Sequence, residues 1–418
     1  MRSPSLFSLS MAAILAGATV LSLAVPVDGA TAQNKKKKKS EKPDVSREFL
    51  EPFNVANEAI ESQDIATAEA KLAEAAPNAR TPDEQFFLGN ATARLGGLKQ
   101  DSQMQRRGLE LMVDSGKAPP EALGNFNYLA GALAYEAKDY AAAEKRFKAS
   151  IDTGFSEKNV NLLYVDSVFR QNRVTEGLQL LRSTIDRMKA AGLDVTEDFY
   201  RSGVRASNNA GMTEEGTYWS QQWVANYPSE TSWREALILF RQNASFPNAI
   251  NIDLMRLMRA NKSLVSEADY SEYIENADPR RLPGEVLAVI QEGSAKGDIS
   301  TSNPFFSENL SMAQERVADD RSSLDSSAAE AKTSSNPVVA IGTADAYLGY
   351  GEYAKAAELY TMALGKPGAD ADLVNTRLGI ANAMQGNYAA AKDSFAKVND
   401  VRKPLADFWM IWIDQQGS

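Results

Sequence analysis

The chain has 418 residues, contains no histidine and no cysteine, and carries a formal net charge of −10. The lack of His and Cys excludes a Ser-His-Asp triad, a cysteine nucleophile, a zincin-type helix, a His/Cys metal site and any disulfide. An acidic body is also a poor nucleic-acid binder, so no nucleic acid is expected as a partner.

The N-terminus, residues 1–32, has the pattern of a secretory signal peptide. Arg2 precedes an uncharged run from Leu6 to Val25, and Ala30-Thr31-Ala32 supplies the small residues that a signal peptidase requires. We therefore expect export to the periplasm and a mature chain that begins at Gln33. The alternatives are a retained inner-membrane anchor, because about 20 apolar residues can span a bilayer, and an ordinary core helix.

A basic run follows the proposed cleavage site, within a tail that spans residues 33–45. The run consists of Lys35, Lys36, Lys37, Lys38 and Lys39. Positive charge close behind an apolar segment tends to stay on the cytoplasmic side, which favours the anchor alternative. The tail is predicted to be disordered and solvated, with contact to an anionic envelope surface as the alternative.

Beyond residue 45, a helical-hairpin pattern returns at nearly fixed spacing. Tyr388 lies 35 residues after Tyr353, and Tyr140 heads the same kind of run. In each run the spacing i, i+4, i+7 places two small residues and an aromatic ring on one helix face. Two such faces are Ala143, Phe147 and Ser150, and Ala391, Phe395 and Val398. We predict that these faces are packing seams between stacked hairpins.

A glycine lies inside the helix that precedes each of these two faces, at Gly131 and Gly379. Glycine in a helix interior costs about 1 kcal/mol relative to Ala. The expected reason for its presence is a close approach between the two helices of a hairpin.

These features resemble the tetratricopeptide repeat family, whose unit of 34 residues pairs two helices with small residues at their crossing. The match is good near residues 124–157, 337–370 and 372–403, and weaker copies extend the array. No unit carries the family's first-helix Trp, and only Tyr347 occupies its first-helix Tyr position. The resemblance implies an all-α fold, a right-handed superhelical solenoid of helical hairpins.

The array is predicted to have two parts joined by a connector. Residues 46–296 form an N-terminal array of degenerate repeats, and residues 337–418 form a pair of repeats with a capping helix. Residues 297–336 are polar and poor in repeats, so we expect an irregular helical connector with flexible edges, with a plain flexible linker as the alternative.

The resemblance also implies a concave groove, lined by first helices, that binds a protein or peptide. The implied lining residues are Asn125, Tyr128, Tyr135, Glu136, Asp166, Phe169, Arg170, Asp345, Thr376 and Met384. They lack the Lys and Asn set with which some members clamp the terminal carboxylate of a peptide. Binding of that kind is therefore not expected.

The C-terminal helix is apolar almost all round, whereas a terminal cap has a polar outer face. Phe408, Trp409 and Trp412 are therefore candidates for a second interface, against the array itself, another subunit or a partner. A second group of large rings is assigned to packing where hairpins meet. It comprises Trp219, Trp223 and Trp233.

The sequence thus predicts a non-catalytic protein-binding scaffold of the bacterial cell envelope, without cofactor or metal. One alternative is an envelope enzyme that cleaves glycan through paired carboxylates such as Glu214-Glu215 or Asp319-Asp320. Such pairs are common in a chain with 55 Asp and Glu, which weakens this alternative. The other is a subunit of a membrane-anchored secretion or polymer-export machine.

Overall fold

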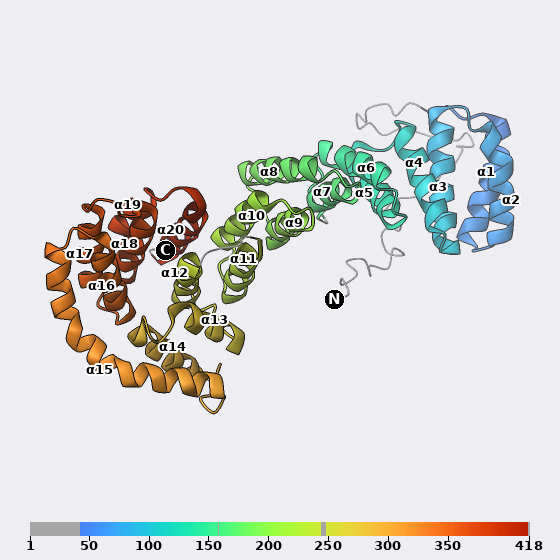
Figure 1. Ribbon diagram of the computed structural model, residues 1–418. Coiled ribbons are helices and arrows are strands. Elements are labelled where there is room, and N and C mark those ends of the chain that lie inside the picture. Colours follow the sequence, from blue (N-terminus) through green and yellow to red (C-terminus); the bar gives the residue numbers. More distant parts are fainter. Residues whose placement is uncertain (1–41, 158, 244–247, 417–418) are drawn as a thin grey trace, which may run out of the picture. The chain divides into compact units, whose positions relative to one another are not determined.

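The computed structural model describes residues 42–157, 159–243 and 248–416. Within these residues the fold is all-α, with twenty α-helices and two short 3-10 helices that follow one another as hairpins (Figure 1). The predicted all-α fold of consecutive helical hairpins is confirmed. The proposed signal peptide and the lysine run lie outside the described residues.

The chain divides into two compact units, residues 1–191 (unit 1) and 192–418 (unit 2). This boundary differs from the predicted one, which placed a connector at residues 297–336. The reason is that most of this polar segment forms one continuous helix, α15 (Pro304–Thr333), which packs against the helices before and after it. Its buried residues include Phe306 and Leu324, so the segment is an element of unit 2.

Unit 1 is a stack of four hairpins. They comprise α1 (Arg47–Glu61) with α2 (Ile65–Ala75), α3 (Pro82–Lys99) with α4 (Ser102–Asp114), α5 (Pro120–Glu136) with α6 (Tyr140–Asp152), and α7 (Val160–Arg170) with α8 (Val174–Ala190). A short 3-10 helix, Ala76–Asn78, follows α2.

Side-chain caps fix where several helices of unit 1 begin. Thr81 and Glu84 form a reciprocal capping box at the start of α3, and Asp139 accepts the backbone N–H of Ala142 at the start of α6. These bonds satisfy backbone donors that have no partner inside a helix.

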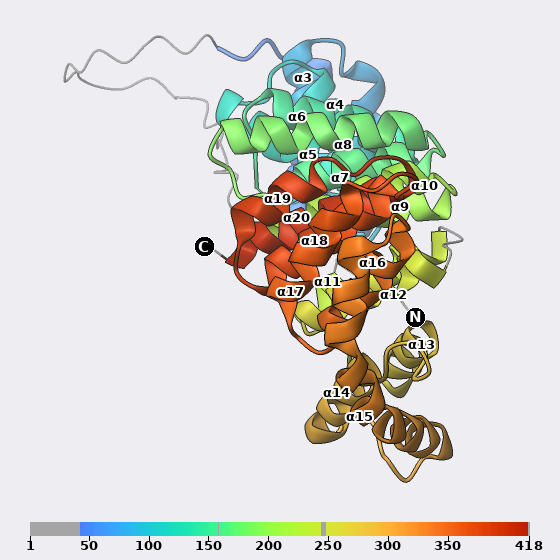
Figure 2. The same ribbon diagram turned by 60° about the vertical axis from the view of Figure 1, so that its left-hand side comes forward.

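Unit 2 contains the remaining helices (Figure 2). Before α15 these are α9 (Glu197–Asn209), α10 (Thr213–Asn226), α11 (Glu230–Asn243), α12 (Asn248–Ala260), α13 (Glu267–Ala277) and α14 (Pro283–Lys296). After α15 come α16 (Pro337–Gly349), α17 (Tyr353–Leu364), α18 (Ala371–Met384), α19 (Tyr388–Phe395), the 3-10 helix η4 (Asp400–Arg402) and α20 (Lys403–Gln416).

The predicted packing seams are confirmed. Phe147 and Phe395 are fully buried, and each ring fills the space left by a glycine in the preceding helix. A Cβ atom at Gly131 would lie 2.8 Å from Cδ1 of Phe147, and one at Gly379 would lie 2.6 Å from Cε1 of Phe395. Both glycines therefore allow a ring to pack against helix backbone.

The large rings of unit 2 are internal. Trp219, Trp223 and Trp233 are buried, as predicted. Phe408, Trp409 and Trp412 of α20 are buried as well. The sequence left three alternatives for these rings, namely packing against the array itself, another subunit or a partner, and the structure shows the first. They offer no second interface on the surface of unit 2, because their apolar area is already covered by neighbouring helices.

Candidate functional site

Three of the predicted groove residues meet on the first helices of unit 1. The hydroxyl of Tyr135 donates a hydrogen bond to Oδ2 of Asp166, and Nε of Arg170 donates to the same oxygen at 3.1 Å. Tyr135 lies on α5, whereas Asp166 and Arg170 lie on α7, so one carboxylate joins the first helices of consecutive hairpins. We refer to these three residues as the Tyr135 cluster.

The electrostatics of the Tyr135 cluster fix its protonation. Burial and the hydrogen bond to Asp166 raise the pKa of Tyr135 well above its usual range, so the phenol stays a hydrogen-bond donor. The bond to Asp166 also raises the pKa of Arg170. The Arg170 side chain is 55% exposed, against 17% for Asp166, so the cluster presents a cation at the surface beside a half-buried tyrosine and a shielded carboxylate.

Two other predicted groove residues of unit 1 belong to packing instead. Tyr128 is buried, with its ring centroid 6.0 Å from that of Phe147 and 5.6 Å from that of Phe155. Phe169 packs against α8, where a Cβ atom at Gly177 would lie 2.4 Å from its ring. The prediction is wrong for both residues, because the ring of Tyr128 points into the seam and the ring of Phe169 packs on Gly177. Asn125 is half-buried and Glu136 is exposed.

A second polar contact between first helices was missed by the sequence analysis. Nη1 of Arg94, on α3, donates to Oδ1 of Asn57, on α1, at 2.7 Å. The signal that could have found it is Gly89, which meets α4 as Gly131 meets α6. Counted from these glycines, Arg94 holds the position that Glu136 holds on α5, five residues later.

The predicted groove residues of unit 2 divide differently. Asp345 and Thr376 are buried, and the hydroxyl of Thr376 bonds within its own helix, to the carbonyl of Asp372 at 2.6 Å. These two predictions are wrong, because both side chains face the interior of unit 2. Only Met384, at the end of α18, is exposed.

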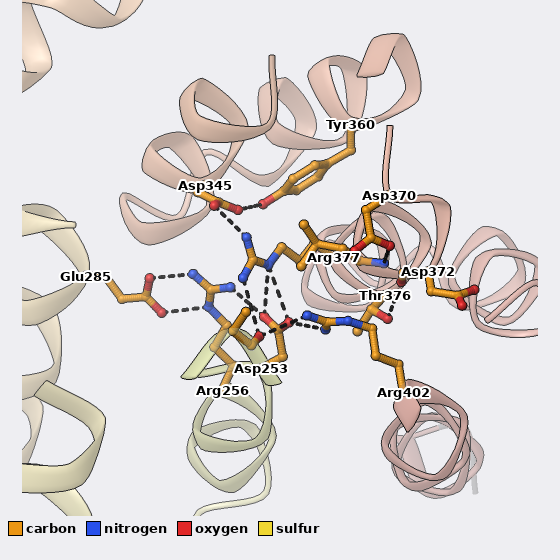
Figure 3. A network of polar contacts seen from close by, with 12 residues as sticks. Asp253, Arg256, Glu285, Asp345, Tyr360, Asp370, Asp372, Thr376, Arg377 and Arg402 are labelled. Atoms are coloured by element: carbon orange, nitrogen blue, oxygen red, sulfur yellow. Dashed lines mark hydrogen bonds and ion pairs between the residues drawn. The ribbon is translucent and has the colours of Figure 1, made fainter. Parts of the chain in front are cut away.

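Asp345 belongs to a buried charged network that the sequence did not predict (Figure 3). At its centre Asp253, on α12, is fully buried. It accepts hydrogen bonds from Nη1 of Arg256 at 2.8 Å, Nε of Arg377 at 3.2 Å and Nη1 of Arg402 at 2.9 Å. The Arg377 and Arg402 partners lie 124 and 149 residues away in sequence, where no local pattern indicates a contact.

The outer part of the network balances the remaining charge. Arg256 donates to both carboxylate oxygens of Glu285, at 2.8 and 2.7 Å, and Nη1 of Arg377 donates to Asp345 at 2.6 Å. Hydroxyls of Tyr273 and Tyr360 bond to Glu285 and Asp345, respectively. Three arginines thus face three carboxylates inside unit 2.

The charged network has the properties of a structural element. Burial by itself raises the pKa of Asp253, but the charges of Arg377, Arg256 and Arg402 outweigh it and lower the pKa. The pKa of Glu285 is lowered in the same way, mainly by Arg256. The carboxylates of Asp253 and Glu285 therefore stay ionised, and each is paired with an arginine, as a stable buried charge requires.

The paired carboxylates considered for glycan cleavage do not form a matched acid and nucleophile. Glu214 and Glu215 lie in the first turn of α10, and Asp319 and Asp320 lie on α15. Consecutive helix residues point in directions about 100° apart, so neither pair holds two carboxyls face to face across a substrate. Asp320 also accepts the hydroxyl of Tyr350 at 2.6 Å.

In the part of the chain that the structure describes, His, Cys, Asp and Glu residues form no group of three that could hold a metal ion. Over the same residues, no helix combines the length and the apolar character that a membrane crossing needs.

Comparisons with known proteins return likenesses to solved structures. No family profile and no curated protein matches the sequence. One similar solved chain comes from the structure of Naa15/Naa10 bound to HypK-THB, with a TM-score of 0.32 and 16% identity over 85% of this chain and 54% of that one. Another comes from the APC/C hetero-tetramer Cut9-Hcn1, with a TM-score of 0.22 and 11% identity over 89% of this chain and 77% of that one. The chain spans about half the length of the first, and neither likeness carries an argument about function.

Proposed function

We propose that this protein is a non-catalytic scaffold that binds a segment of a partner protein on the first-helix face of unit 1. The observation that carries the proposal is the Tyr135 cluster, in which the first helices of two consecutive hairpins bring a tyrosine, a carboxylate and a half-exposed arginine to one surface. Tyr and Arg are among the residue types that dominate binding energy at protein interfaces.

The preorganisation of the cluster supports this role. Asp166 holds Tyr135 and Arg170 in place before any partner arrives, so binding would cost less side-chain entropy than it would with free side chains. The ring would supply most of the binding energy, and the exposed charge of Arg170 would set orientation and association rate.

Unit 2 is a poorer candidate for the same role. Its predicted groove residues Asp345 and Thr376 are buried, and the Asp345 carboxylate already accepts hydrogen bonds from Arg377 and Tyr360. A partner could use these groups only by breaking internal contacts, so the binding face is proposed for unit 1 alone.

Site-specific photocrosslinking in cells tests the proposal. A photoreactive amino acid at Glu136, an exposed residue next to the cluster on α5, should yield one predominant adduct. The matched control is the same amino acid at Arg107, which is exposed on the second helix α4. Adducts of equal yield and identity from both positions would contradict a binding face on the first helices.

We further propose that the scaffold works in the cell envelope, after export. The support is the sequence of residues 1–32, with its apolar run and its Ala30-Thr31-Ala32 site. Soluble periplasmic protein that begins at Gln33 is the expected result of cell fractionation and N-terminal sequencing. Protein that begins at Met1 in the membrane pellet would replace this proposal with an anchored subunit of an envelope machine.

A further inference from the structure

The C-terminal segment of unit 2 has contacts on two sides. On one side Trp409 of α20 stacks on Phe395 of α19, the preceding helix, with ring centroids 6.1 Å apart. On the other side Phe408 meets two rings of α11, Trp233 at 6.1 Å and Phe240 at 5.3 Å between centroids. We refer to residues 400–416 as the strap, because they join the last hairpin to helices much earlier in the chain.

Polar contacts reinforce the second side of the strap. Gln415 accepts a hydrogen bond from Nε1 of Trp233 at 3.1 Å and donates one to the carbonyl of Val224 at 2.8 Å. Gln221 donates to the carbonyl of Pro404 at 3.2 Å. These partners lie 182 to 191 residues apart in sequence.

Arg402 adds a buried ionic contact at the start of the strap. It donates to Asp253 at 2.9 Å and to the carbonyl of Ala249 at 3.2 Å, both on α12. The strap therefore touches α10, α11 and α12 as well as α19, and α20 lies beside these earlier helices (Figure 1).

Such long-range contacts do not occur in an open stack of repeats, in which each hairpin contacts only its neighbours. An open stack ends in a cap with a polar outer face. In unit 2 the last helix is buried on both sides instead, because the array turns back and the strap closes it.

We propose that the strap is a releasable closure: when it leaves α10–α12, it uncovers the apolar face of α11 while the hairpins of α13–α15 stay folded. The hydrogen bonds that join the strap to α10–α12 are made by side chains rather than by backbone pairing, so the strap can detach without unwinding those helices. Its two attachments are also separable, since Phe408 and Trp409 are adjacent residues that contact α11 and α19, respectively. The face that opens carries Trp233 and Phe240, with Ala236 between them at helical spacing.

The absence of cysteine from the chain makes opening directly measurable, because one introduced thiol is the only reactive thiol. Ala236→Cys reports on the α11 face and Ala313→Cys on α15. Both alanines are fully buried, so each thiol reacts with a thiol reagent only when its site opens. The rate of labelling of the full-length chain therefore measures opening at each site.

The test variant is Phe408→Ala and the matched control is Trp409→Ala, since both residues are fully buried on α20. Phe408→Ala removes the contact across the closure and should raise the labelling rate of the α11 thiol by at least about tenfold, with less than about a twofold change for the α15 thiol. Trp409→Ala weakens the contact with α19 and should raise labelling of the α11 thiol less than Phe408→Ala does.

A milder variant separates opening of the strap from a general loss of folding. Gln415→Ala removes two hydrogen bonds across the closure and should give the same pattern with a smaller rise. Equal acceleration for the α11 thiol and the α15 thiol in either variant would overturn the proposal, because unit 2 would then unfold as one body. Unchanged labelling at both sites in Phe408→Ala would overturn it as well, since the strap would not control opening.

Discussion

Asp253 is the residue on which the interior of unit 2 most depends, because three arginines share its single negative charge. Removing one partner of a buried ionic group leaves the others without compensation. Asp253→Asn should therefore lower the free energy of unfolding of unit 2 by about 3–5 kcal/mol, as measured by urea denaturation followed by circular dichroism.

The control for Asp253→Asn is Asp414→Asn, which breaks an exposed ion pair with Lys392 in the same unit. Exposed pairs contribute about 0–1 kcal/mol, so this variant should be almost neutral. Equal losses in the two variants would contradict a structural role for the buried network.

Glu84 makes the stability of unit 1 dependent on pH. Burial alone would raise the pKa of Glu84, but hydrogen bonds from Ser46, Thr81 and Arg80 outweigh it and lower the pKa to about 2. A carboxylate with a lowered pKa stabilises the fold above its unfolded-state pKa of about 4.3, and this contribution is lost as the pH falls toward 2.

Glu84→Gln should therefore destabilise unit 1 by about 2–3 kcal/mol at pH 7. The difference between wild type and variant should shrink between about pH 5 and pH 2. Hydrogen-exchange protection of α1 and α3 measures this stability difference, because Glu84 joins the starts of these two helices. A difference that stays constant over this range would show that the carboxylate charge is not the cause.

At the scale of single helices, two glycines show when close packing, rather than helix propensity, decides the effect of a Gly→Ala substitution. Gly379 and Gly342 both lie inside helices, α18 and α16, but a Cβ atom at Gly379 would lie 2.6 Å from Phe395, whereas one at Gly342 would meet nothing within 4 Å. Gly379→Ala should destabilise unit 2 by about 1–3 kcal/mol through overpacking.

Gly342→Ala should instead stabilise unit 2 by about 0.5–1 kcal/mol, because Ala is the better helix former. Thermal unfolding of the two variants should therefore shift the transition in opposite directions. A stabilising Gly379→Ala would show that the ring of Phe395 does not need the space.

The helices themselves were largely predictable from sequence, because hairpins repeat through local spacing. The seams at Phe147 and Phe395 and the close approaches at Gly131 and Gly379 follow from residues 16 positions apart. The orientation of Tyr128 did not follow, since two rings from α6 and the turn after it decide which way it points.

At the scale of the whole chain, the division into units could not be predicted from local patterns. The polar composition of residues 297–336 suggested a connector, but α15 buries a sparse apolar face against α14 and α16. The closure of unit 2 depends on contacts such as Arg402 with Asp253, 149 residues apart. Charged residues at that distance show no periodicity, so the network was not predicted. For the strap, packing against the array was one of three predicted alternatives, but its contacts with α10–α12 were not predicted.

The two units should respond separately to a core deletion. Phe395→Ala removes a fully buried ring of unit 2 and should cost about 3–5 kcal/mol. Hydrogen-exchange protection should fall in unit 2 and stay at the wild-type level in α1–α8. An equal loss in both units would show that the chain unfolds as one cooperative body.

The central claim is that unit 1 binds a partner segment at the Tyr135 cluster. The most direct test measures the affinity of the crosslinked partner for wild type, for Tyr135→Ala and for a matched control, Tyr164→Ala. Tyr164 of α7 is also half-buried, and its pKa is raised by burial and by charges on α6, including Glu144. Tyr135→Ala should weaken binding by at least about 1–2 kcal/mol, whereas Tyr164→Ala should leave the affinity within about threefold of wild type. Equal affinities of wild type and Tyr135→Ala for the partner would contradict the account.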